Sequence, residues 1–156
     1  MKKDIVAGLG EIGFPIYQIL SKVFSVDGYD IDSNLIPKTN KKFELYHTRF
    51  LHVCIPYNKN FVSQVLKLNK KFLPEAIVIH STIKPGTTRN IQKKLTVPII
   101  YSATRGVHKR MRSDLKKYTK FFALDYTIPN SKLLSSAYTK LMKKSGIKTK
   151  KMSSSI

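Results

Sequence analysis

The sequence predicts an α/β fold with a mainly parallel, doubly wound sheet covered by helices on both faces. Short apolar runs typical of buried strands alternate with helical segments of about 10–15 residues, which is the pattern of strand–helix–strand units. Hydrophobic residues make up 42% of the 156 residues, enough for one packed core and too many for a disordered chain. A single cysteine, Cys54, excludes a disulfide framework and a multi-cysteine metal cluster.

The first two thirds of the chain contribute four predicted strands and three predicted helices. The strands are residues 5–7, 26–31, 51–55 and 76–80, and a further short edge strand is expected at 43–47. The first helix is expected to begin near Gly10, with Pro15 early enough in it to be tolerated. Asn58 is expected to cap the second helix, and Thr87 or Thr88 the third.

The remainder is expected to continue the alternation and to complete one domain. Further strands are predicted at residues 98–102 and 120–124, with a final strand or a frayed tail at 147–152. Ser131 is expected to cap a last helix that ends before Gly146. We therefore expect a single domain over residues 1–152, followed by a linker-like tail at 153–156.

A glycine-rich run at Gly8, Gly10 and Gly13 follows the first predicted strand and opens the first predicted helix. Asp30 lies 20 positions after Gly10, at the end of the second predicted strand, as in a dinucleotide-binding fingerprint. There the first glycine permits a tight turn, the second lets a pyrophosphate approach the helix start, and the third allows close packing. A carboxylate at Asp30 would bind ribose hydroxyls and repel a 2′-phosphate. The pattern therefore predicts a Rossmann-type fold that binds NAD rather than NADP.

The same glycines could form only a tight strand–helix connection without a ligand. The strand before them, the helix after them and the acid at the expected distance together weigh against that interpretation. Glu11 is a mild objection, because a carboxylate beside a pyrophosphate would repel it. We therefore expect the Glu11 side chain to point outwards, where it also suits the helix dipole.

Four sequence blocks stand in order along the chain, at residues 8–15, 28–32, 53–56 and 80–88. Together they resemble the NAD-binding domain of the UDP-glucose/GDP-mannose (nucleotide-sugar) dehydrogenase family. The last block is the most specific, because family members carry a similar S-T-x-x-P-G-T-T turn. The resemblance covers most of residues 5–124. It implies an oxidoreductase that transfers a hydride from C6 of a UDP- or GDP-linked sugar to NAD.

The resemblance also implies roles for individual residues. It assigns the glycine loop with Ile12 to the pyrophosphate and Asp30 to the ribose. Pro56 and Tyr57 would border the adenosine and the nicotinamide ribose, and Thr82 would lie beside the nicotinamide. The predicted cofactor site comprises Gly8, Gly10, Glu11, Ile12, Gly13, Asp30, Asp32, Pro56, Tyr57, Ser81 and Thr82. These residues follow strand ends, where open α/β sheets bind ligands.

Two departures from the family bear on activity. The family's catalytic cysteine belongs to a downstream domain that we expect to be missing here, and Cys54 would be an inert thiol in a strand. The family's Ser-Pro-Glu motif is replaced by Ser102-Ala103-Thr104, so Thr104 stands where a glutamate would handle protons. We predict no catalytic residue in this chain and expect it to be inactive alone. It would be a fragment or a stand-alone module, and its end near the family's connecting helix favours a fragment.

Charge is the unusual feature of the composition, because 29 Lys and Arg against 9 Asp and Glu give a formal net charge of +20. The excess lies in the second half, and no acidic residue follows Asp125. The alternative function is therefore a non-catalytic basic module that binds nucleic acid or an acidic partner. The stretch 105–112 could grip a nucleotide-sugar diphosphate or an RNA backbone, or be a solvated loop. The lysines of the last helix are expected to form a solvated face with weak non-specific polyanion binding.

Other features limit further roles. The four histidines show no metal-ligand spacing, and His52 and His80 are expected to be hydrogen-bonded within the sheet. No apolar run reaches the roughly 18 residues of a membrane helix, so a cytoplasmic protein is expected. We expect a monomer or weak dimer, since the family's dimer interface uses the connecting helix. An active short dehydrogenase completed by another chain is a third hypothesis.

Overall fold

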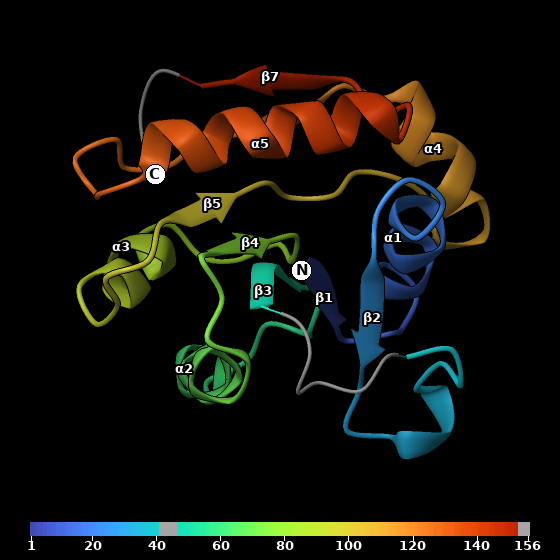
Figure 1. The fold of residues 1–156 in the computed structure, drawn as a ribbon, viewed down its shortest axis with the longest axis horizontal. Coiled ribbons are helices and arrows are strands. Elements are labelled where there is room, and N and C mark those ends of the chain that lie inside the picture. The colour runs from blue at the N-terminus through green and yellow to red at the C-terminus, as the bar shows by residue number, and fades with distance from the viewer. Residues whose placement is uncertain (41–46, 153–156) are drawn as a thin grey trace.

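A five-stranded parallel sheet forms the centre of the computed structural model, which describes residues 1–40 and 47–152 (Figure 1). Its strands are β1 (Lys2–Ala7), β2 (Val26–Tyr29), β3 (His47–Val53), β4 (Ala76–Ile79) and β5 (Ile99–Tyr101). Their spatial order is β2-β1-β3-β4-β5, and each neighbouring pair runs parallel. The direction of winding changes between β1 and β3, which is where open α/β sheets bind ligands. The predicted fold class is confirmed.

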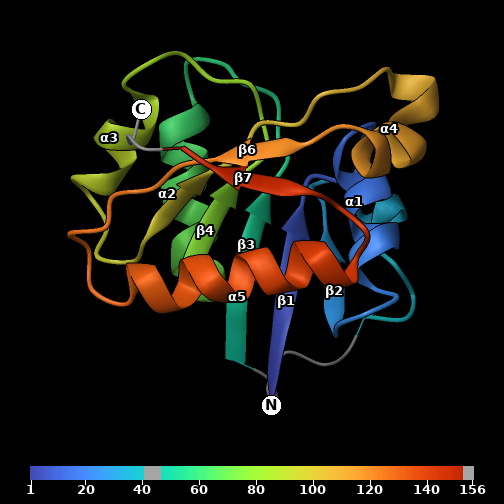
Figure 2. The same ribbon diagram turned by 90° about the horizontal axis from the view of Figure 1, so that it is seen from above.

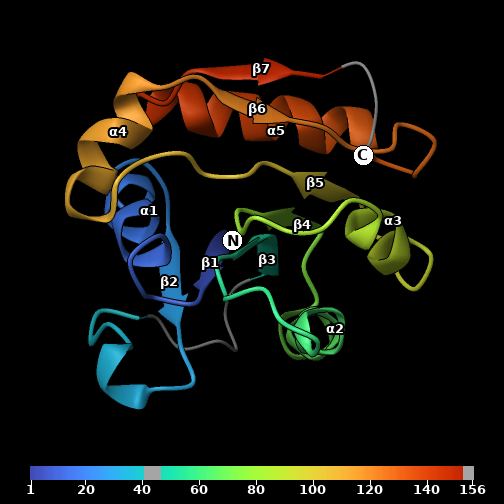
Figure 3. The same ribbon diagram turned by 180° about the vertical axis from the view of Figure 1, so that it is seen from behind.

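Helices cover both faces of this sheet (Figures 1 and 3). One face carries α1 (Gly13–Leu20), α4 (Met111–Lys117) and α5 (Ser131–Lys144), and the other carries α2 (Phe61–Phe72) and α3 (Thr87–Gln92). Side chains alternate along each strand, so that Val6 packs in the first core, and Ile5 and Ala7 in the second. In the described part of the chain, no helix has the length and apolar surface of a transmembrane span.

A second, smaller sheet consists of the parallel strands β6 (Lys120–Phe122) and β7 (Thr149–Lys151). It meets the edge of the main sheet through an antiparallel bridge, in which Tyr101 and Ala123 exchange backbone hydrogen bonds of 2.9 and 3.0 Å. α5 connects the two strands and buries Tyr138 completely, with its ring edge-on to Phe50. Figure 2 shows α5 and this small sheet in front of the central strands.

The opposite edge of the main sheet is β2, and a side chain covers part of it. Asn40 accepts the Gly28 N–H through Oδ1 at 3.0 Å and donates from Nδ2 to the Gly28 carbonyl oxygen at 2.7 Å. A neighbouring strand would bond these same backbone groups. The amide of Asn40 therefore takes the place of a further strand at this position.

Most differences from the predicted elements concern helix starts. α1 begins at Gly13 rather than near Gly10, because the intervening residues form the turn. Asn58 accepts a backbone N–H at 2.8 Å in the turn before α2 and does not cap the helix. Thr87 and Ser131, predicted as caps, are the first helical residues of α3 and α5. The residues before them have φ of +87° and +66°, so backbone conformation rather than a side-chain cap starts both helices.

The remaining differences concern short elements. The predicted edge strand at 43–47 falls mostly on 43–46, outside the described residues, and His47 begins β3. The alternative at 147–152 resolves as the strand β7. α4 has no counterpart among the predicted helices, because its seven residues are mostly polar and only three of them are buried.

Candidate dinucleotide-binding site

The turn between β1 and α1 is so tight that two of its glycines are required by the backbone. Gly8 has a φ of +89°, and a Cβ on it would lie 2.8 Å from the Cys54 carbonyl oxygen. A Cβ on Gly13 would lie 1.6 Å from the Gly8 carbonyl oxygen. At Gly10, by contrast, a Cβ would meet no atom within 4 Å, so the space beside this residue is open. The loop therefore combines a rigid frame with a free face that can receive a phosphate group.

Asp30 meets this loop directly. Its Oδ2 accepts the Leu9 N–H at 2.7 Å, and its Oδ1 accepts the Asp32 N–H at 2.9 Å. The first bond fixes the end of β2 against the glycine loop, and the carboxylate oxygens retain lone pairs that can accept hydroxyl groups. Asp30 and the glycine loop, which the sequence assigns to one site, therefore lie side by side.

The two other acids of the predicted site have partners of their own. Asp32 accepts a backbone N–H at 3.0 Å and caps the short 3-10 helix Ser33–Leu35. The Glu11 side chain is 70% exposed and points outwards, as expected, but it also forms an ion-pair contact from Oε2 to Nδ1 of His108. This contact brings His108, from the basic stretch 105–112, to the glycine loop.

The remaining predicted residues lie in the loops that follow the carboxyl ends of β3 and β4. Pro56, Tyr57 and Thr82 are exposed there, and the Tyr57 hydroxyl lies 3.2 Å from a threonine hydroxyl of α3. Ser81 is buried and donates to the Ile55 carbonyl oxygen at 2.5 Å, so it ties the two loops together. The glycine loop, Asp30 and the loops after β3 and β4 thus all lie at the carboxyl ends of the parallel strands.

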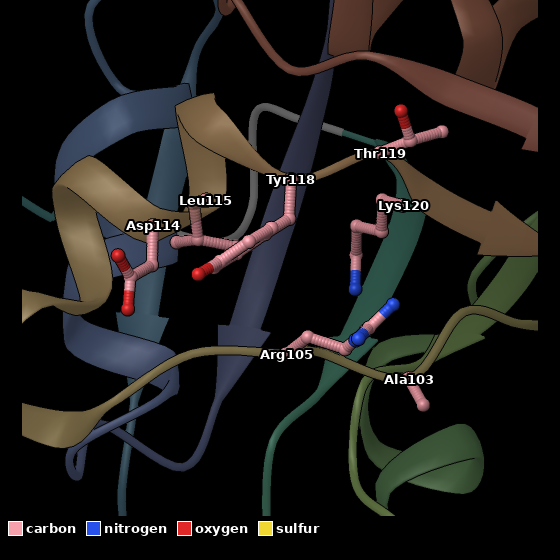
Figure 4. Close-up of a pocket in the computed structure, with 7 residues that line it drawn as sticks. All are labelled: Ala103, Arg105, Asp114, Leu115, Tyr118, Thr119 and Lys120. Atoms are coloured by element: carbon pink, nitrogen blue, oxygen red, sulfur yellow. The ribbon is translucent and has the colours of Figure 1, made fainter.

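A buried lysine, the first residue of β6, reaches with its Nζ the segment that follows β5, although no sequence motif pointed to it. Lys120 is 5% exposed, and its Nζ donates to Thr104 Oγ1 at 2.9 Å and to the Ser102 carbonyl oxygen. Figure 4 shows its side chain pointing towards the loop that carries Arg105. Burial lowers the pKa of Lys120 to about 7, although the nearby Cys54 opposes this shift. The only sign in the sequence is a lysine at the start of an apolar strand.

The Cys54 thiol and the Tyr138 hydroxyl near Lys120 stay protonated near neutral pH. Burial raises the pKa of the Cys54 thiol to about 12, so this cysteine is inert, as expected. Burial also raises the pKa of Tyr138, whose hydroxyl donates to Ser102 Oγ at 2.8 Å. The cavity beside Lys120 has a volume of about 10 Å³, too small for an organic ligand.

His52 and His80 form a buried pair within the sheet. Nδ1 of His52 lies 2.9 Å from Nε2 of His80. Nε2 of His52 is 3.7 Å from Asp4 Oδ2 and makes no hydrogen bond within the described residues, so the expected hydrogen bonding is only partly present. Burial, followed by the charge of Lys120, holds the pKa of His80 well below its usual range. Over residues 1–40 and 47–152, no group of three or more His, Cys, Asp or Glu side chains is placed to hold a metal ion.

No family model and no curated protein matches the sequence, but solved structures match the fold. The UDP-D-ManNAc dehydrogenase from Pyrococcus horikoshii has a TM-score of 0.76 at 18% identity, over 96% of this chain and 46% of that chain. The UDP-N-acetyl-mannosamine dehydrogenase from Staphylococcus aureus has a TM-score of 0.70 at 16% identity, over 97% and 47%. A prephenate dehydrogenase from A. aeolicus, in complex with hydroxyphenyl propionate and NAD+, has a TM-score of 0.65 at 14% identity, over 98% and 60%. The fold is shared with these dehydrogenases.

This likeness confirms the resemblance to nucleotide-sugar dehydrogenases at the level of the fold. The chain spans about half the length of the two UDP-N-acetylmannosamine dehydrogenases that it matches. Nearly all of this chain is covered in each of the two comparisons.

Proposed function

We propose that this chain is the NAD-binding domain of an oxidoreductase similar to the nucleotide-sugar dehydrogenases. The bond from the Leu9 N–H to the Asp30 carboxylate carries the proposal, because it fixes a ribose-binding acid beside an open glycine loop. The likeness to UDP-N-acetylmannosamine dehydrogenases, and to a prephenate dehydrogenase in complex with NAD+, supports NAD as the cofactor. In the complete enzyme, NAD would accept a hydride from C6 of a UDP- or GDP-linked sugar.

The described residues fit the charged and hydroxyl-bearing parts of NAD. The pyrophosphate would occupy the open face beside Gly10, where backbone N–H groups at the start of α1 favour an anion. The contact of Glu11 with His108 would reduce the repulsion that this carboxylate exerts on phosphate. Asp30 would accept bonds from the ribose hydroxyls, and its charge would disfavour the 2′-phosphate of NADP.

Thr104, in the segment after β5, and Lys120, at the start of β6, would accept the proton that the reaction releases. Thr104 stands where the family has a glutamate, and its Oγ1 lies 2.9 Å from Lys120 Nζ. Because the pKa of Lys120 is about 7, part of the amine is unprotonated at neutral pH. In the complete enzyme, the unprotonated Lys120 amine would accept the Thr104 hydroxyl proton, and Thr104 Oγ1 would take the proton that leaves the sugar hydroxyl when the hydride leaves its carbon.

The isolated chain is expected to bind NAD without turnover. The family's cysteine nucleophile and sugar-binding residues belong to a domain outside the region of resemblance. A nucleotide sugar would therefore be a partner only together with that domain.

Isothermal titration of the folded chain with NAD tests the proposal. Asp30→Asn keeps an acceptor for the Leu9 N–H but loses the charge, and should bind NAD about tenfold more weakly, or about 1.4 kcal/mol. The control Asp125→Asn alters a carboxylate that bonds to Thr127 within its own turn, and should bind NAD as the wild type does. Wild-type protein should also prefer NAD to NADP. Absence of binding by folded wild type, or unchanged affinity in Asp30→Asn, would overturn the proposal.

A further inference from the structure

An open groove of about 670 Å³ lies between α5 and β7, on the face opposite α2 and α3. Its lining includes Lys132, Ser136, Thr139, Lys140 and Lys143 from α5 and Lys151 from β7. Figures 1 and 2 both show α5 and β7 side by side. None of the lining residues belongs to the glycine loop or to the loops after β3 and β4, so this α5–β7 groove is separate from the dinucleotide site.

Every charged side chain that lines the α5–β7 groove is a lysine. Lys132, Lys140 and Lys143 come from α5, and Lys151 comes from β7. Their positions on α5, together with those of Ser136 and Thr139, recur at spacings of three and four, so they share one side of the helix. No acidic residue follows position 125 in the sequence, so neither element can supply a counter-charge. Like charges held together in this way favour a bound anion.

The length of the lysine row favours an extended anion over a small one. From Lys132 to Lys143, α5 rises by about 16 Å, at about 1.5 Å per residue. A single phosphate would pair with only part of this row, because an ion pair needs an N···O distance of about 4 Å. A chain of phosphates could contact lysines along the whole groove and would release a counterion at each contact.

Hydroxyl groups and an aromatic ring favour nucleic acid over an acidic polypeptide. Ser136 and Thr139 lie among the lysines, and hydroxyl side chains commonly bond phosphate oxygens. Tyr126 is partly exposed in the groove, its hydroxyl lies 3.0 Å from Ser135 Oγ, and Lys151 Nζ lies 4.2 Å from its ring centroid. A cationic track beside an aromatic ring suits unpaired bases, which can stack on the ring when the Lys151 side chain, now over it, turns to a phosphate. We infer that the α5–β7 groove binds single-stranded nucleic acid through its phosphates.

Fluorescence anisotropy with a labelled oligouridine of about twelve nucleotides tests this inference. The groove variant combines Lys132→Gln, Lys140→Gln, Lys143→Gln and Lys151→Gln. The matched control combines Lys67→Gln, Lys70→Gln, Lys93→Gln and Lys94→Gln, which are exposed lysines of α2 and of the segment after α3. Both variants lose the same charge. The groove variant should lose at least about tenfold in affinity, and its slope of log K against log salt should fall by up to about 3. The control should change less than about threefold.

A second variant separates stacking from charge. Tyr126→Leu should weaken oligouridine binding several-fold and leave binding of inorganic polyphosphate, which has no bases, unchanged. Equal losses in the two lysine variants would overturn the inference, because they would show a response to net charge alone. Competition by polyglutamate as effective as that by unlabelled oligouridine would overturn it too. Displacement of the oligouridine by saturating NAD would show that it binds at the dinucleotide site, and would overturn the inference as well.

Discussion

The two halves of the chain bury a lysine in different ways. Lys3 in β1 is fully buried, and its Nζ lies 2.6 Å from Oδ2 of Asp27, which is also buried. Lys120 in β6 is buried as well, but its hydrogen bonds go to the neutral oxygens of Ser102 and Thr104. A carboxylate stabilises a buried ammonium more than neutral acceptors do. The Lys3 ammonium is therefore held by an ion pair inside the fold. Lys120, in contrast, can give up its proton near neutral pH.

The difference follows from where the acidic residues stand in the chain. Asp4 and Asp27 lie on the first two strands, and Asp4 accepts from Arg49 at 3.1 and 2.9 Å as well. After Glu75 only two acids remain in the sequence, and neither bonds Lys120 in the described structure. Lys120, buried in that part of the chain, bonds no carboxylate within the described residues, and burial lowers its pKa. Exposed lysines in the same part of the chain have few acidic residues to pair with and can bind an external anion, as proposed for those of the α5–β7 groove.

Removal of the carboxylate from the first pair should have the largest effect. Asp27→Leu leaves the Lys3 ammonium buried without this partner and should lower the free energy of unfolding by about 3–5 kcal/mol. Urea denaturation followed by circular dichroism at neutral pH measures the loss. The double variant Lys3→Met, Asp27→Leu should recover most of it. A loss below about 1 kcal/mol in the single variant would mean that the pair contributes no more than a surface contact.

Removal of the second lysine should change how stability depends on pH. The pKa of Lys120 is about 7 in the folded protein, below its usual 10.5, so the unfolded chain binds more protons between these values. Lys120 therefore makes the free energy of unfolding rise with pH across this interval, by up to about 1.4 kcal/mol per pH unit. Lys120→Met should remove that contribution in urea titrations from about pH 6 to pH 10. Identical slopes in the two proteins would contradict the assignment.

Removal of an exposed ion pair should give the smallest loss in the free energy of unfolding. Lys2 Nζ lies 2.7 Å from Glu75 Oε1, with the two side chains 55% and 40% exposed. Glu75→Gln should lower the free energy of unfolding by less than about 1 kcal/mol, because water already solvates both charges. The same urea titration measures it, at low and high salt. A loss as large as that of Asp27→Leu would show that burial does not explain the difference between the pairs.

Features that depend on neighbouring residues could be predicted from the sequence. The short apolar runs predicted the strands of the sheet. The glycine-rich fingerprint predicted a tight turn that needs glycine at positions 8 and 13. The position of Asp30 beside the loop followed from a fixed spacing within one strand–helix–strand unit. Lys120 could not be predicted in this way, because its partners lie 16 and 18 positions away and belong to another loop.

The contact between Glu11 and His108 was equally hidden, since it joins the first crossover to a segment near α4. α4 itself was missed because a helix of seven residues carries too few apolar positions to reveal its period. The α5–β7 groove depends on β7 lying alongside α5, which the spacing of lysines on the helix does not reveal.

The pairing of Asn40 with Gly28 has a consequence for how copies of this protein meet one another. An uninterrupted row of backbone amides at a sheet edge is a template for fibril growth. On β2 that row is broken by a side-chain amide, and beyond β5 the bridge to Ala123 reverses the direction of the next segment. A second molecule therefore meets an interrupted edge on either side, which discourages polymerisation of the folded chain.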